Sequence, residues 1–97
     1  MKLLTLGDSF TYGEELDDRS CAWPQLLADT ISYDLVNLGE PANSNSGICR
    51  QLIDYFANES APDLVLVAWS SPGRMEFSDE GGTFSAWPGG TTRKVFQ

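Results

Sequence analysis

The chain has 97 residues, 41% of them hydrophobic, and 14 acidic against six basic residues give it a formal net charge of −8. This is the size of one small domain with enough apolar residues for a single core. An acidic surface of this kind repels phosphate backbones and anionic lipids. We therefore expect no direct binding to nucleic acid or membranes. No segment resembles a signal peptide or reaches membrane-spanning length, which predicts a soluble, cytoplasmic protein.

The first part of the chain alternates short apolar runs with amphipathic segments. Apolar runs predict buried strands over residues 2–6, 34–38 and 64–69. The third run is the strongest strand signal and is typical of a central parallel strand. Helical spacing of apolar residues predicts one helix over residues 22–32 and another after the loop of residues 40–46. This order predicts an α/β fold, a three-layer α/β/α sandwich on about three parallel strands.

Three local features refine this prediction. The polar, acidic segment of residues 8–19 is expected to be a loop. The second helix has an apolar stripe and follows two serines, Ser44 and Ser46, either of which could cap it. The stripe consists of Ile48, Leu52, Ile53 and Phe56.

The C-terminal part has a different character. Glycine and proline are frequent after residue 72, and no periodicity is evident. We therefore expect an α/β core over residues 1–76 and an irregular tail or lid over residues 77–97. Two glycine pairs, Gly81–Gly82 and Gly89–Gly90, leave a β-hairpin open as an alternative.

The two cysteines, Cys21 and Cys49, are too few for a disulfide framework. Free cysteine is usually a small buried hydrophobe, which is the expectation here. No spacing of acidic residues or cysteines predicts a metal site, and no cofactor motif is found.

A chemically informative motif follows the first predicted strand. The sequence Gly-Asp-Ser-Phe-Thr-Tyr-Gly, residues 7–13, places Ser9 where a strand passes into a loop. Ligands of open α/β sheets bind at that edge. The motif resembles the first signature block of the SGNH (GDSL) serine hydrolase superfamily, and this resemblance implies that Ser9 is a nucleophile.

Two later positions extend the resemblance. Gly39 follows the second strand, as in the family's second block, and implies an oxyanion hole built from the amides of Ser9 and Gly39. After the third strand the family has an asparagine donor. Here Ser71 is nearest that position, and its hydroxyl can donate one hydrogen bond. The Trp-Ser-Ser-Pro turn, followed by Arg74 and Glu76, is similar to phage-encoded relatives.

The family's last block, Asp-x-x-His, has no counterpart, and the 97 residues contain no histidine. The resemblance therefore covers residues 2–76, the N-terminal half of the family's fold. A serine hydroxyl without an adjacent base is a poor nucleophile. We expect an esterase-like domain for a small ester substrate, inactive alone, with the Asp-His pair supplied by a separately encoded or cleaved half.

Two alternatives stay open. The chain could be a small acidic binding protein, of phage origin, that inhibits or decoys a basic host protein without catalysis. It could also be a truncated fragment with no function of its own. In a truncated fragment the outer edge of the third strand would lack a neighbour, which predicts a protein partner or homo-oligomer through this exposed edge, or cover by the tail.

Overall fold

The structure, a computed structural model, describes residues 1–80, 82–87 and 90–94. Its centre is a parallel sheet of β1 (Lys2–Leu6), β2 (Asp34–Asn37) and β3 (Leu64–Val67), in the order β2-β1-β3. The three predicted strands are confirmed. The prediction that the third strand is the central one is wrong, because β1 is central and β3 pairs only with β1 among the described strands. A continuous apolar run indicates that both faces of a strand are covered, but it does not indicate how many strands pair with it.

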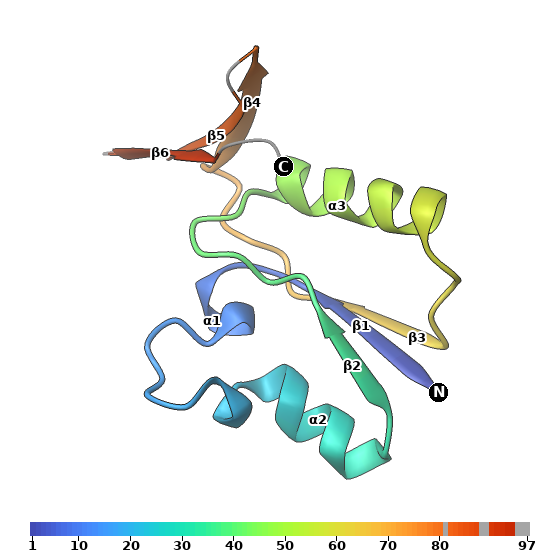
Figure 1. Ribbon diagram of the computed structural model, residues 1–97. Helices are drawn as coiled ribbons and strands as arrows, with labels where there is room; N and C mark the ends of the chain where they lie inside the picture. The colour runs from blue at the N-terminus through green and yellow to red at the C-terminus, as the bar shows by residue number, and fades with distance from the viewer. Residues whose placement is uncertain (81, 88–89, 95–97) are drawn as a thin grey trace.

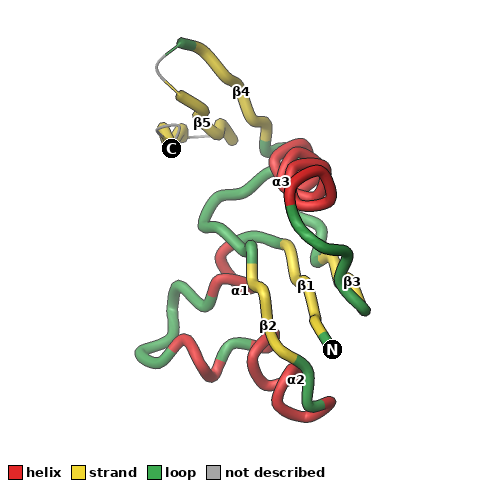
Figure 2. The backbone as a smooth tube through the Cα atoms, turned by 45° about the vertical axis from the view of Figure 1, so that its right-hand side comes forward, coloured by secondary structure: helices red, strands yellow, loops and turns green. Residues whose placement is uncertain are grey.

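Helices cover both faces of this sheet. The short helix α1 (Ser9–Tyr12) and α2 (Trp23–Ile31) lie on one face, and α3 (Asn45–Asn58) lies on the other (Figures 1 and 2). The predicted three-layer α/β/α arrangement is confirmed. The expected loop of residues 8–19 instead contains α1 and the start of a 3-10 helix, Arg19–Cys21, each begun by an aspartate side chain that accepts a backbone N–H.

The main hydrophobic cluster lies between the sheet and α3. Its fully buried members are Leu4 and Leu6 of β1 and Ile48 of α3. Partly buried hydrophobic residues surround them: Val36, Leu38, Leu52, Tyr55, Val65 and Val67. Leu3 of β1 and Ala28 of α2 are also fully buried, outside this cluster. Successive strand residues face opposite sides, so alternate residues of β1 meet α3.

The predicted stripe of α3 is half correct. Ile48 and Leu52 pack against the sheet, whereas Ile53 is 69% exposed and Phe56 is 50% exposed. Tyr55 takes the expected place of Phe56, because the spacing i, i+4, i+7 from Ile48 keeps one helix face toward the sheet. Ser44 caps the helix by accepting the Gly47 N–H at 3.0 Å.

The C-terminal part forms a second sheet, so the expected irregular tail or lid over residues 77–97 is wrong for the residues described. The antiparallel order is β4 (Met75–Asp79), β5 (Gly82–Trp87) and β6 (Gly90–Lys94). β4 packs against α3. The antiparallel pairing of β4 with β5 and of β5 with β6 fits the hairpin alternative, while Gly81 and Gly89 lie outside the described residues. Short strands between turn residues show little periodicity in sequence.

Candidate functional site

Ser9 stands at the carboxyl end of the central strand. β1 ends at Leu6, Asp8 caps α1 by accepting the Phe10 N–H at 3.2 Å, and Ser9 is the first residue of that helix. Its side chain is half-buried, and its hydroxyl has no hydrogen-bond partner among the described residues. The sequence predicts a loop at Ser9 after the first strand; the position beyond the carboxyl end of β1 agrees with this prediction, but Ser9 begins the short helix α1 and does not lie in a loop.

Arg74 connects this turn to the segment after β3. Its Nη1 donates to Asp8 Oδ2 at 3.2 Å, to Ser70 Oγ at 3.0 Å and to the Asn43 carbonyl oxygen at 3.5 Å. Both charged side chains are mostly shielded from water, with 26% of Arg74 and 18% of Asp8 exposed. The ion pair therefore fixes three loops around the residue that precedes Ser9.

A buried amide network holds the loop after β2. Asn43 is fully buried and donates through Nδ2 to the Gly7 carbonyl at 3.2 Å and to Gln51 Oε1 at 2.9 Å. Gln51 in turn donates to the Leu38 carbonyl and to Glu40 Oε1, each at 3.1 Å. The sequence predicts a loop over residues 40–46 but not this network, because nothing local identifies Gln51 of α3 as the partner of Asn43.

The backbone of this loop is strained at one position. Ala42 adopts φ 59°, a left-handed conformation that costs a residue with a Cβ roughly 1–2 kcal/mol. Such outliers persist where the surroundings determine them, and they concentrate at functional sites. Alanine is not among the residues that mark this conformation, so the sequence carried no signal for it.

The three predicted oxyanion donors differ in their availability. The Ser9 amide makes no hydrogen bond within the described residues. The Gly39 amide donates to Asn37 Oδ1 at 2.9 Å and is therefore occupied. Ser71 is exposed, and its Oγ accepts the Gly73 N–H at 3.4 Å. The neighbouring Ser70, which is 7% exposed, makes the contact with Arg74.

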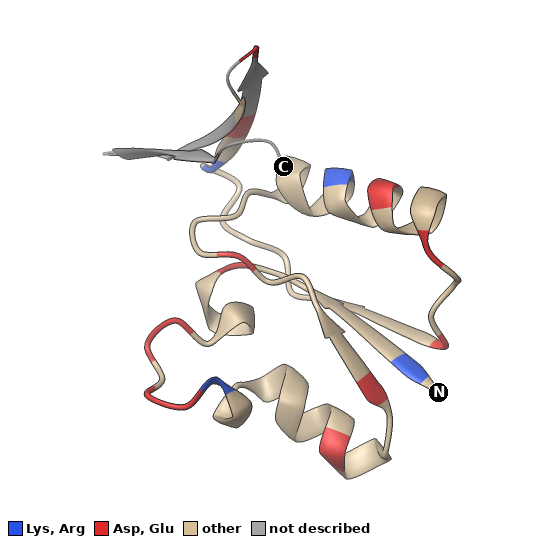
Figure 3. Cartoon of the chain, viewed as in Figure 1, with Lys and Arg blue, Asp and Glu red and all other residues tan. Residues whose placement is uncertain are grey.

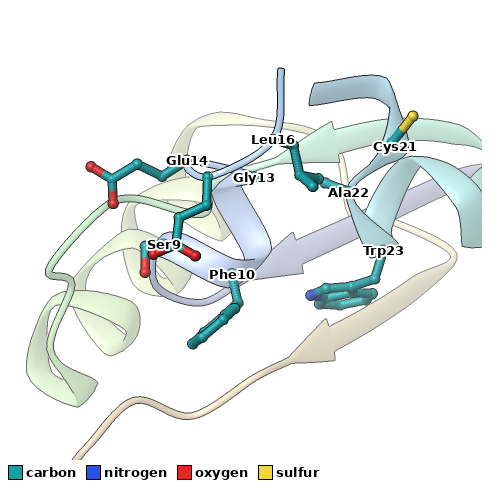
Figure 4. A pocket seen from close by; sticks show the side chains of 9 residues that line it. Ser9, Phe10, Gly13, Glu14, Leu16, Cys21, Ala22 and Trp23 are labelled. Atoms are coloured by element: carbon teal, nitrogen blue, oxygen red, sulfur yellow. The ribbon is translucent and has the colours of Figure 1, made fainter. Parts of the chain in front are cut away.

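An apolar pocket of about 210 Å³ opens beside Ser9 (Figure 4). Its lining comes from α1, the loop after it and the start of α2: Ser9, Phe10, Gly13, Glu14, Glu15, Leu16, Cys21, Ala22 and Trp23. The Cys21 sulfur points away from Phe10 and Trp23 in this view. Both cysteines are exposed, contrary to expectation, because each lies on a helical segment at a position that faces solvent.

Acidic side chains collect on the loop between α1 and the 3-10 helix (Figure 3). Glu14, Glu15, Asp17 and Asp18 are all exposed. The hydroxyl and the backbone N–H of Ser20 donate to Asp18 and lower the pKa of its carboxyl group. No group of three metal-binding side chains is found in the part of the chain that the structure describes.

No protein-family model matches the chain, and a search of curated proteins finds no match. Among the described residues no helix is long and apolar enough to cross a membrane. The structure therefore establishes a small α/β domain with a three-stranded parallel sheet, and the function has to be argued from the site itself.

Proposed function

We propose that the chain is an SGNH-type serine ester hydrolase-like domain in which Ser9 is the acyl-accepting nucleophile. The observation that carries this proposal is the place of Ser9: it lies three residues after the end of the central strand, its hydroxyl has no hydrogen-bond partner among the described residues, and the pocket opens beside it. Ligands bind at this edge of open α/β sheets. The Gly-Asp-Ser-x-Thr-x-Gly resemblance supports the same assignment.

The reaction requires a general base, and the family's histidine base is missing because these 97 residues include no histidine; an exposed carboxylate is too weakly basic to be a good substitute. Ser9 Oγ attacks the ester carbonyl carbon, the Oγ–C bond forms, and the bond to the alcohol oxygen breaks. The base transfers the Ser9 proton to the departing alcohol, and water then releases the acid and restores the hydroxyl. Losing the histidine costs a serine protease on the order of 10⁶ in kcat, so the domain alone is expected to be nearly inactive.

A fluorophosphonate probe tests the assignment, because it labels activated serines. We expect slow labelling of the chain alone and faster labelling when imidazole is added as an exogenous base. Ser9→Ala abolishes the labelling, whereas Ser46→Ala, a change at an exposed serine of α3, leaves it intact. Absence of labelling in imidazole, with a folded circular dichroism spectrum, would rule out Ser9 as the nucleophile.

A non-catalytic binding protein is the second candidate, and the state of the oxyanion donors favours it. The Gly39 amide already donates a hydrogen bond to Asn37, and Ser71 is exposed to solvent. Of the three predicted oxyanion donors, one is therefore engaged and another is not shielded from water. The acidic surface would suit a basic protein partner. Here Ser9→Ala should leave capture of the partner unchanged, and rising salt should weaken it; salt-independent capture would contradict the charge argument.

A further inference from the structure

The pocket beside Ser9 has a size and lining that define a class of ligand. Its volume of about 210 Å³ exceeds that of the engineered cavities of roughly 150 Å³ that hold benzene. We propose that it takes an apolar acyl or aryl group of about six to eight non-hydrogen atoms, from a substrate that is neutral or cationic and not anionic. Calling this ligand a substrate rests on the proposed function, whereas binding of the apolar group to the pocket does not depend on that function.

The apolar walls are in place before a ligand arrives. Trp23 is held by its indole N–H, which donates at 3.3 Å to the hydroxyl of the fully buried Thr11. Phe10 is 76% exposed and Leu16 is 43% exposed, so both lose contact with water when an apolar group enters. Removing apolar surface from water is the favourable term in such binding, and aromatic rings add specific contacts.

The charges around the pocket have one sign. Glu14 and Glu15 belong to the lining, and neither carboxylate is in an ion pair within the described residues. Arg19, the nearest basic residue in sequence, is not part of the lining; it stacks on the Tyr12 ring at 3.7 Å and donates to the Tyr12 carbonyl at 3.0 Å. Among the described lining residues, a bound anion would therefore meet two negative charges and no lysine or arginine.

The size of the discrimination follows from the width of the pocket. A sphere of about 210 Å³ is about 7 Å across. If this width is taken as the separation between each carboxylate and the charge of the ligand, two carboxylates favour a monovalent cation over an anion on the order of fivefold to tenfold near 0.1 M salt. Benzylamine, benzyl alcohol and benzoate form a matched series for this test, since they differ mainly in charge. The Trp23 indole N–H resonance reports occupancy by NMR.

We expect benzyl alcohol and benzylamine to shift the Trp23 resonance, and benzoate to bind on the order of fivefold more weakly than benzylamine. The double change Glu14→Gln and Glu15→Gln should bring the two dissociation constants together, as should high salt. Leu16→Phe narrows the pocket and should weaken all three ligands. Leu26→Phe is the matched control, because Leu26 is 53% exposed on α2 outside the pocket.

Two results would overturn this inference. Equal affinity for benzoate and benzylamine in the unaltered chain would remove the charge selection. No shift of the Trp23 resonance with any of the three compounds would remove the ligand class, even if the fluorophosphonate labels Ser9. Conversely, binding without labelling would refute the nucleophile assignment and leave the pocket's ligand class standing.

Discussion

The ion pair between Arg50 of α3 and Glu76 of β4 offers the sharpest test of how the second sheet is held. Arg50 Nε donates to Glu76 Oε2 at 2.8 Å and Nη2 donates to Oε1 at 3.0 Å, a bidentate geometry. The Glu76 side chain is 6% exposed and Arg50 is 39% exposed. The hydrogen bonds from Arg50 to Glu76 are also the main reason that the pKa of Arg50 is raised.

Arg50→Met would remove the cation and leave the Glu76 carboxylate buried. Breaking a fully buried pair from one side costs about 3–5 kcal/mol. Because Arg50 is partly in water, we discount this to roughly 2 kcal/mol, a substantial share of the 5–15 kcal/mol typical of a domain. For a chain of this length the loss lowers Tm by about 8–16 °C. Asp54 provides the internal comparison, since its carboxylate lies 3.7 Å from Arg50 but is 65% exposed.

Urea unfolding followed by circular dichroism measures these effects. We expect about 2 kcal/mol for Arg50→Met, less than about 0.5 kcal/mol for Asp54→Asn, and a coupling of roughly 1–2 kcal/mol between Arg50→Met and Glu76→Gln in a double-mutant cycle. The reasoning is refuted if Asp54→Asn costs as much as Glu76→Gln, or if the cycle shows no coupling.

Two further predictions concern the first sheet and its turns. A Cβ added at Gly39 would lie 2.8 Å from Thr11 Cγ2 and 2.9 Å from the Thr11 carbonyl carbon, so Gly39→Ala should destabilise the chain by about 1–3 kcal/mol in urea unfolding; a loss below about 0.5 kcal/mol would contradict this packing role. Asp18 has a lowered folded-state pKa, so its bonds to Ser20 contribute stability above about pH 4 that is lost as the pH falls through the folded-state pKa. Ser20→Ala should raise the Asp18 pKa in an NMR titration, and an unchanged pKa would show that the hydroxyl is not the main cause.

The three parallel strands and the two longer helices were predictable, because local patterns determine these elements, whereas the second sheet, with short strands and no periodicity, was not. The apolar runs that became β1, β2 and β3 are bounded by turn residues, and Ser44 precedes α3 at a capping position. The sheet order was not predictable in the same way, since the neighbours of a strand depend on contacts far along the chain. Register pairs such as Leu3 with Leu64 join residues that no local pattern relates.

In the candidate site, too, the features set by neighbouring residues were predictable and those that depend on distant residues were not. Asp8, Ser9 and Gly13 are all local to one turn: Asp8 caps α1, and Gly13 ends it with φ 88°, which glycine adopts readily. Arg74 and Asn43 reach the site from segments 66 and 35 residues after Asp8 in the chain, so only the folded structure shows that they surround it.

Asn37 explains why a nucleophile position is easier to predict than an oxyanion donor. The Gly39 amide is engaged by a side chain two residues earlier, and Asn37 is itself fixed because its Nδ2 donates to the Thr11 carbonyl at 2.9 Å and its Oδ1 accepts from the Thr5 hydroxyl at 3.1 Å. Releasing the amide for an oxyanion would leave Asn37 Oδ1 with the Thr5 hydroxyl alone, and a partly buried acceptor that loses a partner costs free energy. A glycine at the end of a strand therefore places an amide near the site, but the side chain that precedes it decides whether that amide is free to stabilise a transition state.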